Sequence, residues 1–344
     1  MNSPAFIDHS SHARPGIQPF PDRLYVVTAI SNPARYRSRY NLYRAFEKHV
    51  ADSGAILSTV EMAFGGRPFE ITDPANPRHV QVRGEHELWH KENLLNIGIS
   101  RLPAEAKYIA WIDADVTFTR TDWAQETLQQ LQHFPVVQMF SESVDLGPDN
   151  QIVGTAVSWT ESWKRGYAFR GKRNALVDGS MLAQSGGSRQ PAKGIWHSGL
   201  AWAARREALD QLGGLIDFAI LGSADRNMAA GLLGFMEDTI DPTFSPEYRT
   251  ALLEWQKRAE RHIRRNLGQV DGTLVHHWHG CKRNRFYTER WKILSKYQFN
   301  PLTDIKRDAQ GLWQLEDDHT PRFVGLRDAL RQYFRSRNED SIDL

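Results

Sequence analysis

The sequence has very little cysteine, with Cys281 as its only one in 344 residues. An intramolecular disulfide is therefore excluded, and this content is typical of a reducing compartment. No stretch approaches the roughly 20 apolar residues that cross a bilayer. The polar N-terminus, rich in Pro, Ser and His, contains no apolar run of signal-peptide length. We therefore expect a cytoplasmic protein without a transmembrane segment.

A strong charge of either sign is also lacking. The 43 Lys and Arg residues nearly balance the 41 Asp and Glu residues, which leaves a net charge of +2. This balance neither requires nor excludes nucleic acid as a partner. The hydrophobic content of 40% is sufficient for a sizeable core, in one large domain or in one domain with an appendage.

The first part of the chain alternates between strand and helix patterns. Apolar, β-branched runs predict strands, and apolar residues at helical spacing predict helices between them. The expected strands are residues 24–30, 55–64, 107–112 and 134–140, and the expected helices are residues 36–51, 84–103 and 123–131. This order predicts an α/β fold with a mixed, mostly parallel central sheet flanked by helices.

The second part begins with residues 141–194, which are rich in Gly, Ser, Arg and Trp and show no periodicity. They predict either a surface loop or a mobile lid. Further strands and helices are expected after them, in residues 195–214, 246–268, 272–280, 287–299 and 322–334. We expect an N-terminal arm (1–22), a main domain (23–300, with halves 23–140 and 141–300) and a C-terminal helical extension (301–344).

Two carboxylates, Asp113 and Asp115, close the apolar strand in "KYIAWIDADVTF". Alternation along a strand places residues two apart on the same side, where like charges repel unless a cation offsets them. In open α/β sheets, ligands bind outside the carboxyl ends of the strands. Mg²⁺ and Mn²⁺ suit oxygen ligands and often bring substrate phosphates. The pair predicts a metal that joins the protein to a diphosphate; the alternative is an ordinary turn after a strand.

Four segments in order carry a resemblance to a known family. "WIDADVTF" resembles the D-x-D element of nucleotide-sugar glycosyltransferases with the GT-A fold, a Rossmann-like α/β fold. "LWHKENLLNIGISRLP" resembles the preceding helix of beta-1,4-galactosyltransferase-like and related family 2 enzymes. "HSGLAWAARREALDQLGGLID" with "ILGSADRNMAAGLLG" resembles their acceptor-side segment, and "HHWHG" with "RNRFYTER" their C-terminal histidine segment. The resemblance spans about residues 24–300.

This resemblance implies a metal site for Mn²⁺ or Mg²⁺. Asp115 would bind the ion directly, and Asp113 would hold the ribose or a water on the metal. The family takes a further ligand from a histidine near the end of the domain, where His277 and His279 stand two apart. Alternation places both on one face of a strand, with His279 the better candidate and His276 pointing the other way. A buried histidine cluster without metal is the alternative.

The resemblance also implies a catalytic base, Asp225 in "LGSADRNM". A carboxylate there could take the proton of the acceptor hydroxyl as it attacks the anomeric carbon. The alternative, compatible role is that of a helix N-cap. Many family members have two or three consecutive acids at this place, whereas Ala224 and Arg226 flank Asp225 here.

Five further residues are expected to bind the donor nucleotide. Asn32, after the first strand, would lie against the base, and Glu61 would accept a hydrogen bond from uracil unless it is an ordinary solvent-facing strand residue. Lys91 would meet a phosphate as a point charge, or be a solvated helix residue. Arg283 and Arg285 would close over the diphosphate and neutralise the leaving group.

Together these features predict a metal-dependent glycosyltransferase. It would transfer a sugar from a nucleotide-diphosphate sugar, UDP-sugar by expectation, to a hydroxyl of a carbohydrate or other acceptor, with inversion. The alternatives are a nucleotidyltransferase, although its glycine-rich phosphate loop is missing, and a non-catalytic sugar- or nucleotide-binding relative. The acceptor could also be a modified DNA base bound by the basic run 257–266, but a solvated helix face is the preferred interpretation of that run.

Overall fold

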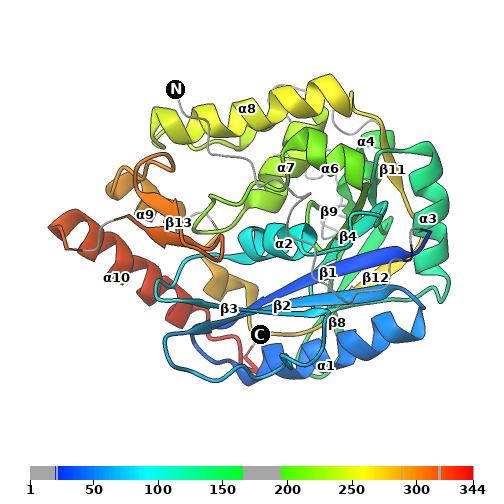
Figure 1. Ribbon diagram of the computed structural model, residues 1–344, viewed down its shortest axis with the longest axis horizontal. Helices are drawn as coiled ribbons and strands as arrows, with labels where there is room; N and C mark the ends of the chain where they lie inside the picture. The colour runs from blue at the N-terminus through cyan, green and yellow to red at the C-terminus, as the bar shows by residue number, and fades with distance from the viewer. Residues whose placement is uncertain (1–19, 21, 166–194, 288, 317–318, 344) are drawn as a thin grey trace, which may run out of the picture.

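The computed structural model describes residues 20, 22–165, 195–287, 289–316 and 319–343 (Figure 1). Almost all of the predicted N-terminal arm, and residues 166–194 of the predicted loop or lid, lie outside the described residues.

A seven-stranded sheet forms the centre of the molecule, in the order β11-β6-β10-β4-β1-β2-β3. Its strands are β1 (Leu24–Ser31), β2 (Ile56–Phe64), β3 (His79–Gly84), β4 (Tyr108–Ile112), β6 (Val136–Gln138), β10 (Ala201–Arg205) and β11 (Leu267–Gln269). The pairs β1–β2, β1–β4, β2–β3 and β6–β11 are parallel, whereas β10 runs antiparallel to both of its neighbours. The predicted mixed, mostly parallel sheet is confirmed.

Helices cover both faces of this sheet, so its strands are apolar on both sides. Leu24 and Val26 of β1 face a core with α1 (Arg37–Asp52) and α3 (Trp123–His133). Tyr25 and Val27 face a second core. Its helices are α2 (Lys91–Ser100), α6 (Arg206–Leu212), α7 (Ala224–Leu233) and α8 (Pro246–His262) (Figure 1).

Helix α2 lies close on the sheet and begins later than the sequence pattern predicted. A Cβ on Gly98 would lie 2.5 Å from Val27 Cγ1 and 2.7 Å from Val60 Cγ2, so only glycine permits this approach. The predicted helix over residues 84–103 starts at Lys91, because Trp89 donates its backbone N–H to Ile220 O (2.8 Å) instead of joining a helical turn.

A second, five-stranded sheet has the order β5-β12-β7-β8-β9. Its strands are β5 (Val116–Phe118), β7 (Glu142–Leu146), β8 (Ile152–Ser158), β9 (Ile195–His197) and β12 (Thr273–His276). The expectation of a loop is therefore wrong for residues 142–164, which form β7, β8 and α4 (Trp159–Lys164). The pairing partner of β7, β12, lies some 130 residues later in the chain. In addition, β7 turns a charged residue, Asp145, to its buried side, so the alternation of apolar and polar residues was hidden in the sequence.

The C-terminal part packs on the second core and then returns to α1. It contains α9 (Trp291–Lys296), the hairpin β13 (Ile305–Arg307) and β14 (Trp313–Leu315), and α10 (Pro321–Ser336). Apolar residues of α10, such as Leu326 and Leu330, belong to the core that contains α2. Beyond α10, the Asp340 carboxylate accepts hydrogen bonds from the backbone N–H groups of Arg37 and Ser38, both at 2.9 Å.

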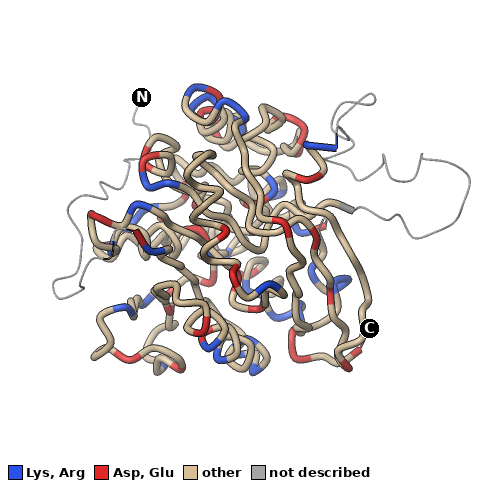
Figure 2. Tube along the Cα trace, turned by 90° about the vertical axis from the view of Figure 1, so that its right-hand side faces the viewer, with Lys and Arg blue, Asp and Glu red and all other residues tan. Residues whose placement is uncertain are grey.

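Basic and acidic residues are interspersed along the trace (Figure 2). In the basic run 257–266 of α8, Lys257 forms an ion pair with Glu254 at 2.6 Å, and Arg258 donates to Leu212 O. None of the helices within the described ranges has the length and apolar character that crossing a membrane requires.

Candidate active site

A pocket of about 180 Å³ lies at the carboxyl ends of β1 and β4, where the chain passes from the first sheet to the second. This is the edge at which open α/β sheets bind ligands. Its lining comes from segments far apart in the sequence, including residues 29–34, 88–91 and 113–115, then His276, His279, Lys282, Arg285, Tyr287 and Arg290, and the C-terminal Arg337 and Glu339.

The D-x-D turn connects β4 with β5 and is held by backbone hydrogen bonds to both sheets. Asp113 N donates to Leu200 O at 2.8 Å, and His277 N donates to Asp115 O at 2.9 Å. The Asp113 side chain pairs with Lys91 Nζ at 2.5 Å. Although burial disfavours the ammonium, Asp113 raises the pKa of Lys91, so Lys91 stays charged. The two carboxylates of the turn therefore have different partners.

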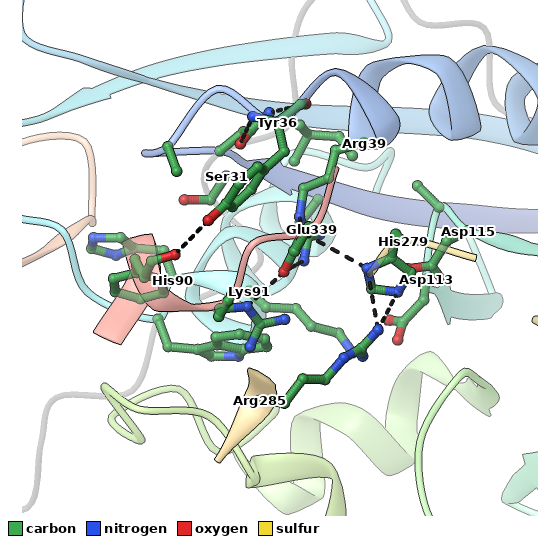
Figure 3. Close-up of a pocket in the computed structure, with 18 of the residues that line it drawn as sticks. Ser31, Tyr36, Arg39, His90, Lys91, Asp113, Asp115, His279, Arg285 and Glu339 are labelled. Carbon is green, nitrogen blue, oxygen red and sulfur yellow. Dashed lines mark hydrogen bonds and ion pairs between the residues drawn. The ribbon is translucent and has the colours of Figure 1, made fainter. Parts of the chain in front are cut away.

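Asp115 meets two histidines in a cluster that could hold a metal ion. Asp115, His276 and His279 each offer one ligand atom, and these atoms lie within 4.8 Å of one another. Asp115 lies beside His279 (Figure 3), with Oδ2 3.0 Å from His279 Nε2. His279 Nε2 is in turn 3.2 Å from His276 Nε2. Asp115 Oδ1 is buried and has no hydrogen-bond partner among the described residues. An unpaired buried carboxylate oxygen beside two imidazoles suits a divalent cation.

The electrostatics of the cluster favour the protonation state that a metal needs. Burial lowers the pKa of His279, and the adjacent Arg285 guanidinium lowers it further. His279 is therefore a neutral imidazole at pH 7 with a lone pair available.

The histidine that joins the cluster is not the one that alternation predicted. The structure brings Asp115 and His279 together as expected, but adds His276, while His277 turns away with Nε2 2.8 Å from Thr117 Oγ1. The expectation that His276 points away from the site is wrong, because β12 ends at His276 and the period of two does not continue beyond it. Asp113 lies in the pocket but outside the cluster.

Asp225 stands in the pocket wall, in the first turn of α7. The N-cap of α7 is Ser223, so the alternative that Asp225 is the N-cap is wrong; its Oδ1 accepts from Arg226 N at 2.8 Å. Gly199 packs directly on this carboxylate. The two lie so close that a Cβ on residue 199 would overlap Asp225 Oδ2. The backbone of the β9–β10 connection therefore limits where the Asp225 carboxylate can lie.

Asn32 and Glu61 have different surroundings. Asn32 lines the pocket, and its side chain holds the turn after β1 by accepting from Tyr36 N (2.9 Å) and donating to Tyr36 O (2.8 Å). Glu61 is not part of the pocket lining. Its buried carboxylate accepts hydrogen bonds from Glu70 N (2.7 Å) and from the N–H and hydroxyl of Thr72, so these groups occupy the oxygens that were expected to meet uracil.

Of the two predicted arginines, Arg285 reaches the pocket and Arg283 does not. Both lie in the short 3-10 helix η4 (Lys282–Arg285). With three residues per turn, side chains two apart point in different directions. Arg285 Nη2 lies 2.9 Å from His279 Nε2 (Figure 3), whereas the Arg283 side chain is exposed.

Sequence reasoning missed several charged residues of this site. Arg39, Arg290, Arg337 and Glu339 line the pocket and are largely buried. Glu92 lies next to it in α2, and burial raises its pKa to about 7 despite the neighbouring Lys91. None of these residues belongs to a recognisable motif, so only their burial distinguishes them from solvated charges.

The sequence matches no known family model and no curated protein. Among solved structures, the chain is similar to a mutant of Drosophila beta-1,4-galactosyltransferase 7 in complex with manganese, UDP-Gal and xylobiose, with 10% identity, a TM-score of 0.38, and coverage of 90% of this chain and 98% of that one. The catalytic domain of the same enzyme with xylobiose gives 10% identity and a TM-score of 0.35, over 89% and 98% of the two chains. A protein described as a "putative nucleotide-diphospho-sugar transferase" from Desulfovibrio desulfuricans gives 11% identity and a TM-score of 0.28, with coverage of 90% of this chain and 96% of that one. At these values the likenesses establish neither a family nor an activity.

Proposed function

We propose that this protein is a metal-dependent glycosyltransferase that uses a nucleotide-diphosphate sugar, with UDP-sugar as the first candidate. The observation that carries the proposal is the Asp115–His276–His279 cluster, with its unpartnered buried oxygen, in a pocket at the carboxyl edge of a mostly parallel sheet. The sequence resemblance of the D-x-D segment agrees with it.

The charges around the cluster support a diphosphate as ligand. Lys91, Arg285 and Arg290 all line the pocket and can neutralise phosphate oxygens. A bound Mn²⁺ or Mg²⁺, held by Asp115, His276 and His279, would offset the charge that builds up on the departing diphosphate. Asp113, held by Lys91, stands beside this position.

Asp225 is the proposed general base. It lines the same pocket as Asp113 and Lys91. Among the carboxylates that line this pocket, Asp225 is the one that lies in the first turn of a helix. The acceptor hydroxyl oxygen would form a bond to the anomeric carbon while the bond from that carbon to the diphosphate breaks, and the hydroxyl proton would pass to the Asp225 carboxylate. Attack opposite the leaving group gives inversion.

A thermal-shift screen of nucleotides and nucleotide-sugars, with and without Mn²⁺, tests the proposal. We expect UDP or a UDP-sugar to raise the melting temperature only when Mn²⁺ is present. Asp115→Ala should abolish that increase, because it removes a proposed ligand of the ion. Stabilisation by UDP without any cation, or by ATP or CTP instead, would refute the proposal.

A further inference from the structure

Each imidazole of the cluster has a buried carboxylate behind it, and each carboxylate comes from a distant part of the chain. Asp145 of β7 lies behind His276, and Glu339, after the end of α10, lies behind His279. The side chains of Asp145 and Glu339 are only 12% and 2% exposed. Burying a charge is costly unless it has partners. We therefore asked which groups each of these carboxylates contacts.

The contact at His276 determines which ring nitrogen carries the proton. His276 Nδ1 is 2.8 Å from Asp145 Oδ1, and a carboxylate only accepts hydrogen bonds. A neutral His276 therefore carries its proton on Nδ1, and the lone pair of Nε2 faces the cluster. Lys282 Nζ, 2.6 Å from Asp145 Oδ2, gives this buried carboxylate a second partner.

At His279 the carboxylate comes from the C-terminal segment. Glu339 Oε2 lies 3.7 Å from His279 Nδ1, whereas His279 Nε2 faces Asp115 Oδ2 at 3.0 Å (Figure 3). Glu339 is held by two arginines: Arg39 Nη2 and Arg337 Nε donate to its Oε1 at 2.8 and 2.6 Å.

The C-terminal segment packs directly on the loop that carries His279. A Cβ on Gly280 would lie 2.8 Å from both Asn338 O and Glu339 Cα. Trp278 Nε1 donates to Ser341 O at 2.8 Å. The position of Glu339 is therefore tied to the position of the histidine and not only to α1.

We propose that Asp145 and Glu339 are positioning residues for the metal site, which hold the imidazole rings of His276 and His279 so that Nε2 of each faces the ion. The C-terminal segment is then a structural part of the site. This inference rests on the metal site of the proposed function, and it adds the residues that orient its ligands. Carboxylates that hold the second nitrogen of a metal-bound histidine typically change metal affinity by about 10- to 100-fold.

Two measurements on the full chain test this inference. The first is Mn²⁺ affinity, from electron paramagnetic resonance of free Mn²⁺, for wild type, Glu339→Gln and Asp145→Asn. The second is the tautomer of each histidine without metal, from long-range ¹H–¹⁵N spectra. We expect both variants to bind Mn²⁺ about 10- to 100-fold more weakly, and we expect wild-type His276 to be protonated on Nδ1.

Two further variants separate positioning from folding. Asp340→Asn is the matched control, because Asp340 holds the same segment to α1 through Arg37 N and Ser38 N, and its side chain bonds to these groups and not to His279. It should change Mn²⁺ affinity by less than about threefold, below the range expected for a positioning residue. Glu339→Asp keeps the charge between Arg39 and Arg337, and so the fold, but withdraws the carboxylate from His279; it should weaken Mn²⁺ binding as Glu339→Gln does.

The inference is overturned if both Glu339 variants bind Mn²⁺ like wild type, if Asp340→Asn weakens binding equally, or if wild-type His276 is protonated on Nε2. A wild type with the His276 proton on Nδ1 that binds no Mn²⁺ would instead refute the proposed function and leave the orientation of the imidazoles standing.

Discussion

Replacing Gly199 with alanine should separate the position of the Asp225 carboxylate from its chemistry. An added Cβ would overlap Asp225 Oδ2 and lie 3.4 Å from its Cγ. Gly199 does not have a left-handed backbone, so alanine causes no strain there. The group that must move is the end of a side chain, and we expect it to shift by on the order of 1 Å. A misplacement of that size costs about 10²-fold in rate.

The assay is sugar transfer from the donor identified by the thermal-shift screen, with Mn²⁺ affinity measured in parallel. Gly199→Ala should lower kcat about 100-fold and leave Mn²⁺ affinity unchanged, because Gly199 does not touch the cluster. Gly66→Ala is the control, since a Cβ there meets nothing within 4 Å. In a double-mutant cycle, Gly199→Ala should add little to the loss caused by Asp225→Asn. Full activity of Gly199→Ala, or additive losses in the cycle, would refute the placement of the base.

Two further predictions follow from the histidines and from Glu92. His276→Ala should weaken Mn²⁺ binding at least about tenfold, since it removes a ligand, whereas His277→Ala should change it by less than about twofold; equal effects would contradict the assignment. Burial raises the pKa of Glu92 from 4.5 to about 7, so the protonated form stabilises the fold at low pH, and that stabilisation is lost as the pH rises through 7. The difference of about 2.5 pKa units corresponds to about 3 kcal/mol. Denaturant unfolding at pH 5 and pH 8 should show this loss in wild type but not in Glu92→Gln, and parallel pH profiles would refute it.

Local patterns in the sequence were enough to predict the central sheet and the turn that holds the site. Strands β1, β2 and β4 are buried on both faces, so their sequences are nearly continuous apolar runs. Such runs can be recognised without knowing which strands lie next to them. The two carboxylates stand out because they follow such a run directly. Asp225 was expected from the family resemblance, which implies an acidic residue at the start of a helix after a glycine-containing loop, and it lies in the first turn of α7.

Long-range contacts decided what local patterns could not. Glu61 looked available for a ligand, but a loop nine to eleven residues away saturates its oxygens. Residues 142–164 became strands and a helix because β7 pairs with β12, which is far along the chain.

The sequence by itself determined the class of fold, the acidic turn at the end of β4 and the presence of histidines near the end of the main domain. Only the tertiary structure decided that His276 joins Asp115 and His279, and that Asp145 and Glu339 stand behind the two imidazoles. The physical reason is that periodicity describes a side chain's direction only while the element continues. A buried ion pair between residues about 60 or 130 positions apart leaves no periodic signal at either position.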